Sequence, residues 1–170
     1  EVAHGCGRLL VDLVERDVTA RQILTREALE NGVAVAVATG GSTNAVLHLL
    51  AVAHEAGVRL TLDDFDRISA TTPLLADMKP WGRFVAPDLH HAGGVALVAR
   101  RLLEGGYLKG GMLTVTGQTL SGEVSEAEET VGQEVVRSAA NPIKDRGGLI
   151  VLRGNLAPDG AVMKVSGTKR

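Results

Sequence analysis

The run from Glu27 to Gly57, EALENGVAVAVATGGSTNAVLHLLAVAHEAG, decides the fold class of this 170-residue chain. Residues 27–39 are apolar on several faces, which predicts either a buried helix or a buried strand, and periodicity alone does not choose between them. The glycine pair at 40–41 ends this segment. Ser42 or Thr43 then caps a strongly apolar helix. Aromatic residues make up only 2% of the chain and 21 residues are glycine, a composition that favours helices packed on a buried sheet and so an α/β architecture.

The flanking sequence predicts more helices, together with short β-prone runs. Helices are expected at 4–16 and 62–68. A further long helix is expected to begin with Asp88 as its N-cap and to end at 105–106. The β-prone runs are 71–78, 113–115, 148–153 and 161–165. Thr19 with Gln22 has the pattern of a capping box, and Thr25 is a further cap. Residues 123–137 contain five glutamates and are expected to form a solvated loop, and 155–160 a turn. The pattern changes at Asn141-Pro142, so we expect an α/β part over 1–140 and the start of a β-rich part over 141–170.

The composition excludes several classes of protein. Hydrophobic residues make up 45% and charged residues 22%, which excludes wholesale disorder and collagen-like repeats. A net charge of −2 argues against a nucleic-acid or anionic-membrane partner. The longest apolar run, 33–39, is far shorter than a membrane span. The one cysteine, Cys6, permits no intrachain disulfide, cannot hold an iron–sulfur cluster alone, and is expected to be a small buried residue.

The best local candidate for a binding site is the turn formed by Gly41, Ser42, Thr43 and Asn44 after Gly40. Glycines let the backbone approach a ligand closely, and the free N–H groups of the following helix favour a carboxylate or phosphate. The alternative is an ordinary glycine turn with an N-cap. The pattern is neither a P-loop nor G-x-G-x-x-G.

Other polar residues carry weaker signals. His48 lies in an apolar helix and is expected to be a core histidine, and one of His90 and His91 could face a pocket. The acids at 63, 64 and 66 are expected to begin a helix rather than bind a metal ion. Asp77 ends a β-prone run, where α/β proteins often place functional groups. The residues alone thus indicate an α/β chain with one candidate anion-binding turn.

Several motifs, in order along nearly the whole chain, resemble the dihydroxy-acid dehydratase and phosphogluconate dehydratase family. They are Thr25–Ala28, Gly40–Leu50, Leu62–Phe65, Asp77–Pro80 with Gly82, Asp88–His90 with Ala92–Gly94, Leu113–Gly117, Asn141–Ile143, Gly147-Gly148 and Gly154–Pro158. Within the family, 88–90 and 114–120 are most similar to the branched-chain biosynthetic branch. A sugar-acid dehydratase of the same family is the alternative.

The resemblance implies removal of water from a 2,3-dihydroxy acid, giving a 2-keto acid, in an enzyme that uses an iron–sulfur cluster and Mg²⁺ as Lewis acids. The family's cluster cysteines, its magnesium ligands and its serine base lie in motifs that this chain lacks. We therefore expect no catalytic residue and no metal ligand here, and we expect the isolated 170 residues to be inactive. The turn at 41–44 is the candidate substrate cleft.

The resemblance also predicts where the chain belongs. It implies an internal fragment: the end of a three-layer α/β/α catalytic domain and the first strands of a β-barrel-like C-terminal domain. The expected partners are a small dihydroxy acid and a second copy in a homodimer, with a cytoplasmic location, and neither nucleic acid nor membrane. A non-catalytic stand-alone binding module is the rival from another class. Trp81 stands where the family pattern suggests a small residue, and it would narrow a pocket lined by its loop.

Overall fold

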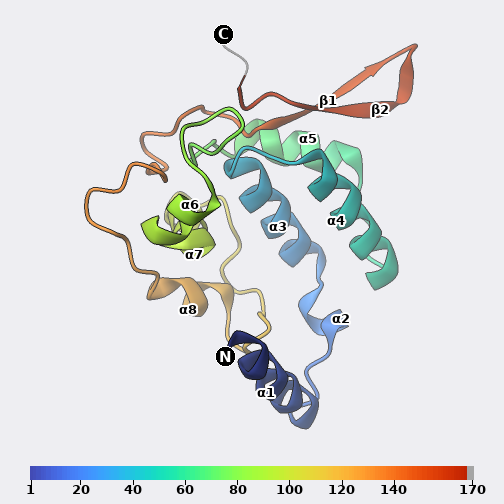
Figure 1. Ribbon diagram of the computed structural model, residues 1–170. Helices are drawn as coiled ribbons and strands as arrows, with labels where there is room; N and C mark the ends of the chain where they lie inside the picture. Colours follow the sequence, from blue (N-terminus) through green and yellow to red (C-terminus); the bar gives the residue numbers. More distant parts are fainter. Residues whose placement is uncertain (168–170) are drawn as a thin grey trace.

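The computed structural model describes residues 1–167 and contains eight helices and one two-stranded sheet in that range (Figure 1). The elements are α1 (Val2–Glu15), α2 (Ala20–Ile23), α3 (Arg26–Ala38), α4 (Thr43–Ala56), α5 (Leu62–Thr71), α6 (Ala86–Ala92), α7 (Gly94–Glu104), α8 (Leu120–Ser125), β1 (Leu149–Gly154) and β2 (Ala157–Lys164). None of the described helices is long and apolar enough to cross a membrane. A helix-rich body followed by two antiparallel strands agrees with the expected end of an α/β domain and start of the next one.

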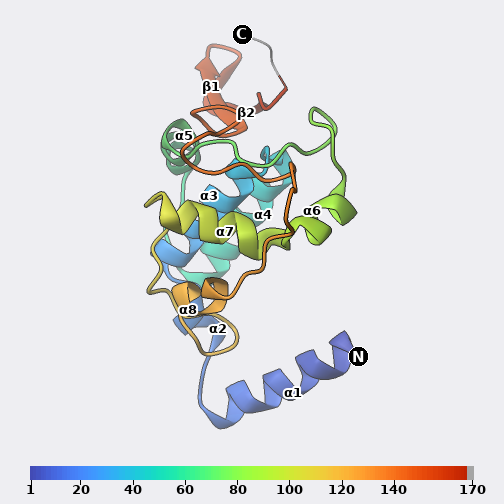
Figure 2. The same cartoon turned by 90° about the vertical axis from the view of Figure 1, so that its left-hand side faces the viewer.

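Helix α3 resolves the helix-or-strand ambiguity of residues 27–39. Its backbone begins after Thr25, whose hydroxyl accepts from the N–H of Ala28 at 3.2 Å, as the cap pattern predicts. Val33 and Val37 are completely buried. The helix packs against α4, α5 and α7, so it is enclosed on several sides and needs no single apolar stripe (Figure 2).

The hydrophobic core surrounds α3 and extends to the loops that follow. Its largest fully buried apolar side chains are Phe65, Leu75, Leu97, Leu102 and Leu149. They come from α5, α7, β1 and the segment after α5, so residues far apart in the sequence close one core. Helix α1 contributes no buried residue and extends from this body (Figure 2).

Two of the expected strands are reduced to isolated bridges. Residues 71–78 form only single pairings, Leu74 with Lys144, Ala76 with Val136 and Met78 with Phe84. The partner segment 134–144 runs beside them irregularly, so no continuous ladder forms. At 113–115 the structure has one bridge, between Leu113 and Thr119.

The C-terminal hairpin is longer than predicted. Strands β1 and β2 pair from Leu149 with Lys164 to Gly154 with Ala157, which leaves only residues 155–156 in the turn. The expectation of a loop over 155–160 was wrong. Pro158 lies in β2, which pairs with β1 alone among the described residues, so the missing N–H of proline can be placed at the unpaired edge of β2.

The helix expected to open at Asp88 differs in two ways. Its N-cap is Val85, and Asp88 lies at the third helical position, where its carboxylate accepts from the N–H of Val85 at 2.8 Å. Gly93, at φ 132°, then divides the helix into α6 and α7. A Cβ at this position would lie 2.3 Å from the carbonyl oxygen of Glu128, so the close approach of that loop requires glycine.

Candidate functional site

The turn at residues 40–44 joins α3 to α4 and has two parts of different character. Gly40 and Gly41, at φ 101° and 73°, are buried and reverse the chain direction. Ser42, Thr43 and Asn44 are exposed at the start of α4. The Ser42 hydroxyl accepts from the N–H of Ala45 at 3.4 Å, so it serves as the predicted helix cap.

A second glycine pair, Gly147 and Gly148, covers the first one, and no sequence pattern predicts that the two pairs meet. A Cβ on Gly148 would lie 2.1 Å from the carbonyl oxygen of Gly40, and a Cβ on Gly41 would lie 2.6 Å from Cγ of Leu149. The N–H of Gly148 donates to the carbonyl of Val37 at 3.0 Å. The two backbones touch because neither carries a side chain there, and this contact fixes the start of α4 against the hairpin.

Polar groups remain available at the exposed end of this turn. Within residues 1–167, the side chains of Thr43 and Asn44 have no hydrogen-bond partner. Ser166, from the segment after β2, lies close to Gly40, and its buried hydroxyl oxygen also lacks a partner in the described part of the chain. The turn can therefore offer hydroxyl and amide groups to a small polar ligand.

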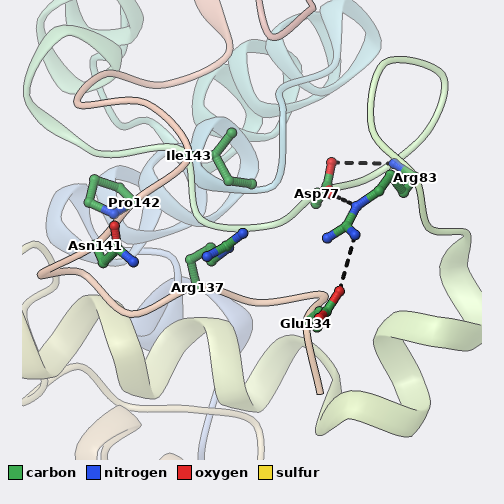
Figure 3. A pocket seen from close by; sticks show the side chains of 7 residues that line it. All are labelled: Asp77, Arg83, Glu134, Arg137, Asn141, Pro142 and Ile143. Carbon is green, nitrogen blue, oxygen red and sulfur yellow. Dashed lines mark hydrogen bonds and ion pairs between the residues drawn. The ribbon is translucent and has the colours of Figure 1, made fainter. Parts of the chain in front are cut away.

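Asp77 lies in a second polar region that the sequence reasoning otherwise missed. Its Oδ2 accepts from Nε of Arg83 at 2.6 Å, and Nη1 of Arg83 donates to Oε2 of Glu134 at 3.1 Å (Figure 3). These contacts raise the pKa of Arg83, the hydrogen bond with Asp77 contributing most. The three side chains border a pocket of about 520 Å³, here called the Arg137 pocket, whose lining is completed by Arg137, Asn141, Pro142 and Ile143.

Trp81 does not line the Arg137 pocket, although Asp77 and Arg83 on either side of it do. Its side chain is 61% exposed, and the indole lies against Gly167. The expectation that Trp81 narrows or caps a pocket lined by its loop concerned the substrate cleft, so it stays a prediction.

The remaining candidates are dispersed. His48 and Cys6 are exposed, so the expectation that they are buried was wrong. His90 and His91 are exposed neighbours with ring centroids 5.7 Å apart. His91 borders a hollow of about 320 Å³ beside Asp88.

The acids Asp63 and Asp64 lie in the first turn of α5, as predicted, and with Asp66 they connect this helix to its neighbours. Asp63 pairs with Arg153, Asp64 with Arg26, and Asp66 accepts from the N–H of Val151 at 3.0 Å. Burial raises the pKa of Asp64, but hydrogen bonds from Arg26 and Thr61 outweigh it and hold that pKa well below its usual range.

No metal-binding cluster exists in the described part of the chain. Within residues 1–167, no group of three or more His, Cys, Asp or Glu side chains could hold a metal ion. A lone exposed cysteine also does not fit an iron–sulfur cluster, which needs about four ligands. These residues thus supply no site for either cofactor that the family resemblance implies.

Comparisons with known proteins cover almost the whole chain. Residues 1–126 match the family domain described as dihydroxy-acid/6-phosphogluconate dehydratase N-terminal, and residues 134–170 match the C-terminal domain of the same description. Proteins named dihydroxy-acid dehydratase are 56% identical over 170 residues in Koribacter versatilis, 54% over 165 in Thermus thermophilus and 51% over 164 in Saccharolobus islandicus.

The matches extend over all of this chain but over a limited part of the relatives. They cover 100%, 96% and 95% of the chain, respectively, and 30%, 30% and 29% of the length of those proteins. The family's N-terminal domain alone matches well over half of the 170 residues. The chain belongs to the dihydroxy-acid/6-phosphogluconate dehydratase family.

Proposed function

We propose that this chain is part of a dihydroxy-acid dehydratase, a hydro-lyase that converts 2,3-dihydroxy acids to 2-keto acids in branched-chain amino-acid biosynthesis. The observation that carries the proposal is the 56% identity, over every residue of the chain, to a protein of that name. The relatives reported above bear the dihydroxy-acid name and favour it over the sugar-acid branch, which the family description also includes.

Within that enzyme, we assign residues 41–44 to the substrate cleft. The support is geometric: the buried glycines hold the start of α4 in place, and the side chains of Thr43 and Asn44 are exposed and without partners in the described structure. A hydroxyl and an amide can hydrogen-bond to the hydroxyl groups or the carboxylate of a dihydroxy acid. Their contribution is binding and orientation, since neither group is a base near neutral pH.

The cofactors require residues other than those described here. An iron–sulfur cluster and Mg²⁺ would supply the Lewis acid that draws off the C3 hydroxyl, but residues 1–167 offer no ligand set for either. We therefore expect the 170-residue chain alone to show no turnover. From the family resemblance we also propose a homodimer and a cytoplasmic location for the whole enzyme.

The domain boundary near Asn141 is also part of the proposal. The two family domains match on either side of residues 127–133, and the irregular segment that follows still pairs with the α/β part, as Lys144 does with Leu74. Regular strands begin only at Leu149. These observations support our proposal that the boundary between 140 and 141 lies in the connection between the two parts.

The test is a dehydration assay on the product of the complete gene, loaded with its cofactors. We expect 2-keto acid to form from 2,3-dihydroxyisovalerate at a kcat/KM at least about tenfold above that for gluconate or 6-phosphogluconate. Equal or better turnover of the sugar acids would refute the assignment to the branched-chain branch. No dehydration of any of these substrates would refute the dehydratase function and favour a binding module.

A variant pair tests the cleft assignment. Asn44→Ala should raise KM for the dihydroxy acid about tenfold, because one hydrogen bond to a charged or strongly polar ligand contributes about 1.5 kcal/mol. His48→Ala, one turn later on the exposed part of α4, is the matched control and should leave KM unchanged. Equal KM values for the two variants would refute the assignment of residues 41–44 to the substrate cleft.

A further inference from the structure

The Arg137 pocket combines two guanidinium groups that face a common space. It lies between the loop that carries Asp77 and Arg83 and the segment from Glu134 to Ile143 (Figure 3). At about 520 Å³ it has room for a small organic molecule. The two sides of the pocket are tied together by the backbone, since the N–H of Asp77 donates to the carbonyl of Val135 at 2.9 Å.

Arg83 is oriented by two ion pairs and has one further N–H donor group. Nε and Nη1 bond to Asp77 and Glu134, and its guanidinium carbon lies 4.8 Å from the ring centroid of Phe84. Its Nη2 has no partner among residues 1–167. Both carboxylates of the pocket are therefore already engaged by Arg83, and they fix its orientation.

Among the residues that the structure describes, Arg137 is the charged side chain of this pocket that has no counter-ion. Its backbone N–H donates to the carbonyl of Leu75 at 2.9 Å, which fixes its position in the chain. Its side chain makes no hydrogen bond or ion pair with any described residue and extends toward Arg83 (Figure 3). Two guanidinium groups that share a space repel each other, and an anion placed between them removes that repulsion.

The other walls indicate what kind of anion fits. Pro142 and Ile143 present apolar surface, and Asn141 adds an amide. Arginine forks match the planar geometry of a carboxylate, and a single carboxylate can accept from two such groups. An apolar body of a few carbons would cover Ile143, whose side chain is 37% exposed.

We propose that the Arg137 pocket binds a short-chain organic carboxylate, held between Arg137 and Nη2 of Arg83 with its apolar body against Pro142 and Ile143. This binding goes beyond the proposed dehydratase function, because it depends only on the geometry of the pocket. A carboxylate side chain from another part of the protein could satisfy the same two arginines. In that case an added small carboxylate would find the pocket filled.

The experiment measures binding of isobutyrate to the product of the complete gene by calorimetry, with the uncharged isobutyramide as the matched ligand. We expect saturable binding of isobutyrate and none of the amide. Arg137→Gln should weaken binding at least tenfold. Arg146→Gln, which removes an exposed arginine of the same segment outside the pocket, should change it less than twofold.

Three results would overturn the proposal: no isobutyrate binding to the parent protein, equal binding of isobutyramide, or unchanged affinity in R137Q. If R137Q does not fold, as judged by circular dichroism, Arg137→Lys takes its place. The lysine keeps the charge but loses the fork, so affinity should fall severalfold, and an unchanged affinity would refute the arrangement. Because the readout is binding, the result is independent of whether the dehydration assay succeeds.

Discussion

Ser69 joins the two parts of the structure through one buried hydroxyl, and its removal should be costly. It lies on α5 with no exposed surface. Its Oγ donates to the carbonyl of Leu149 at 2.6 Å and accepts from the N–H of the same residue at 3.3 Å. In addition, the N–H of Gly147 donates to the carbonyl of Ser69 at 2.7 Å, so α5 holds the chain where β1 begins.

The magnitude follows from the groups left without a partner. Ser69→Ala removes one donor and one acceptor and leaves two backbone groups of Leu149 buried without them, at about 1–3 kcal/mol for each group. Alanine is the better helix former by about 0.5 kcal/mol, which offsets part of the loss. We expect the free energy of unfolding to fall by about 1.5–5.5 kcal/mol.

Urea unfolding followed by circular dichroism measures the change, and hydrogen exchange at the Leu149 amide reports on the contact itself. Thr71→Ala is the control: its exposed hydroxyl bonds only to helix carbonyls within α5, so its effect should stay within about 0.5 kcal/mol. If S69A unfolds within 0.5 kcal/mol of the parent and exchange at Leu149 is unchanged, the hydroxyl does not hold α5 to β1.

Two further substitutions test the turn and the charge cluster. Gly41→Ala should lower the free energy of unfolding by at least about 3 kcal/mol in the same urea assay. The alanine would have to adopt the positive φ of Gly41, and its Cβ would clash with Leu149. A loss below 1 kcal/mol would show that the glycine contact is not tight. Asp64 has a folded-state pKa below its unfolded value, so its stabilising effect is present above about pH 4 and is lost as pH falls through the acid range. When the pH falls from 5 to 2, the free energy of unfolding of the parent should therefore decrease by about 1–3 kcal/mol more than that of Asp64→Asn. Identical acid profiles of the two proteins would refute a depressed pKa of Asp64.

The sequence predicted well where the determinants are local. The caps Thr19 and Thr25 were identified correctly, and Ser42 was one of the two candidates for the cap of α4, because each cap depends on a side chain within four residues. The wrong prediction that Asp88 is an N-cap also concerns a local interaction. A carboxylate at the third helical position can accept a hydrogen bond from the cap residue, so an acid near a helix start does not identify the N-cap.

The features that sequence reasoning missed depend on partners distant in the chain. Residues 71–78 have a β-prone composition but form no continuous strand, because the segment 134–144 pairs with them only at single residues. Arg83 and Glu134 are 51 residues apart, and no spacing pattern connects them. His48 was expected in the core because its helix is apolar, yet Val46 and Ala53 are the buried residues of α4 and the face with His48 is exposed.

The glycine pairs at 40–41 and 147–148 belong to motifs of the family, and only the structure explains why both pairs are needed. Each pair suggests only a turn when considered alone. In the structure they form one contact, since a Cβ on Gly148 would reach the backbone of Gly40 and one on Gly41 would reach Leu149. That contact, with Ser69 behind it, sets the position of Thr43 and Asn44 relative to the hairpin. A substitution in either pair should therefore change both the stability and the position of Thr43 and Asn44. Asn44→Ala should leave the stability unchanged, because the Asn44 side chain makes no hydrogen bond with any other described residue.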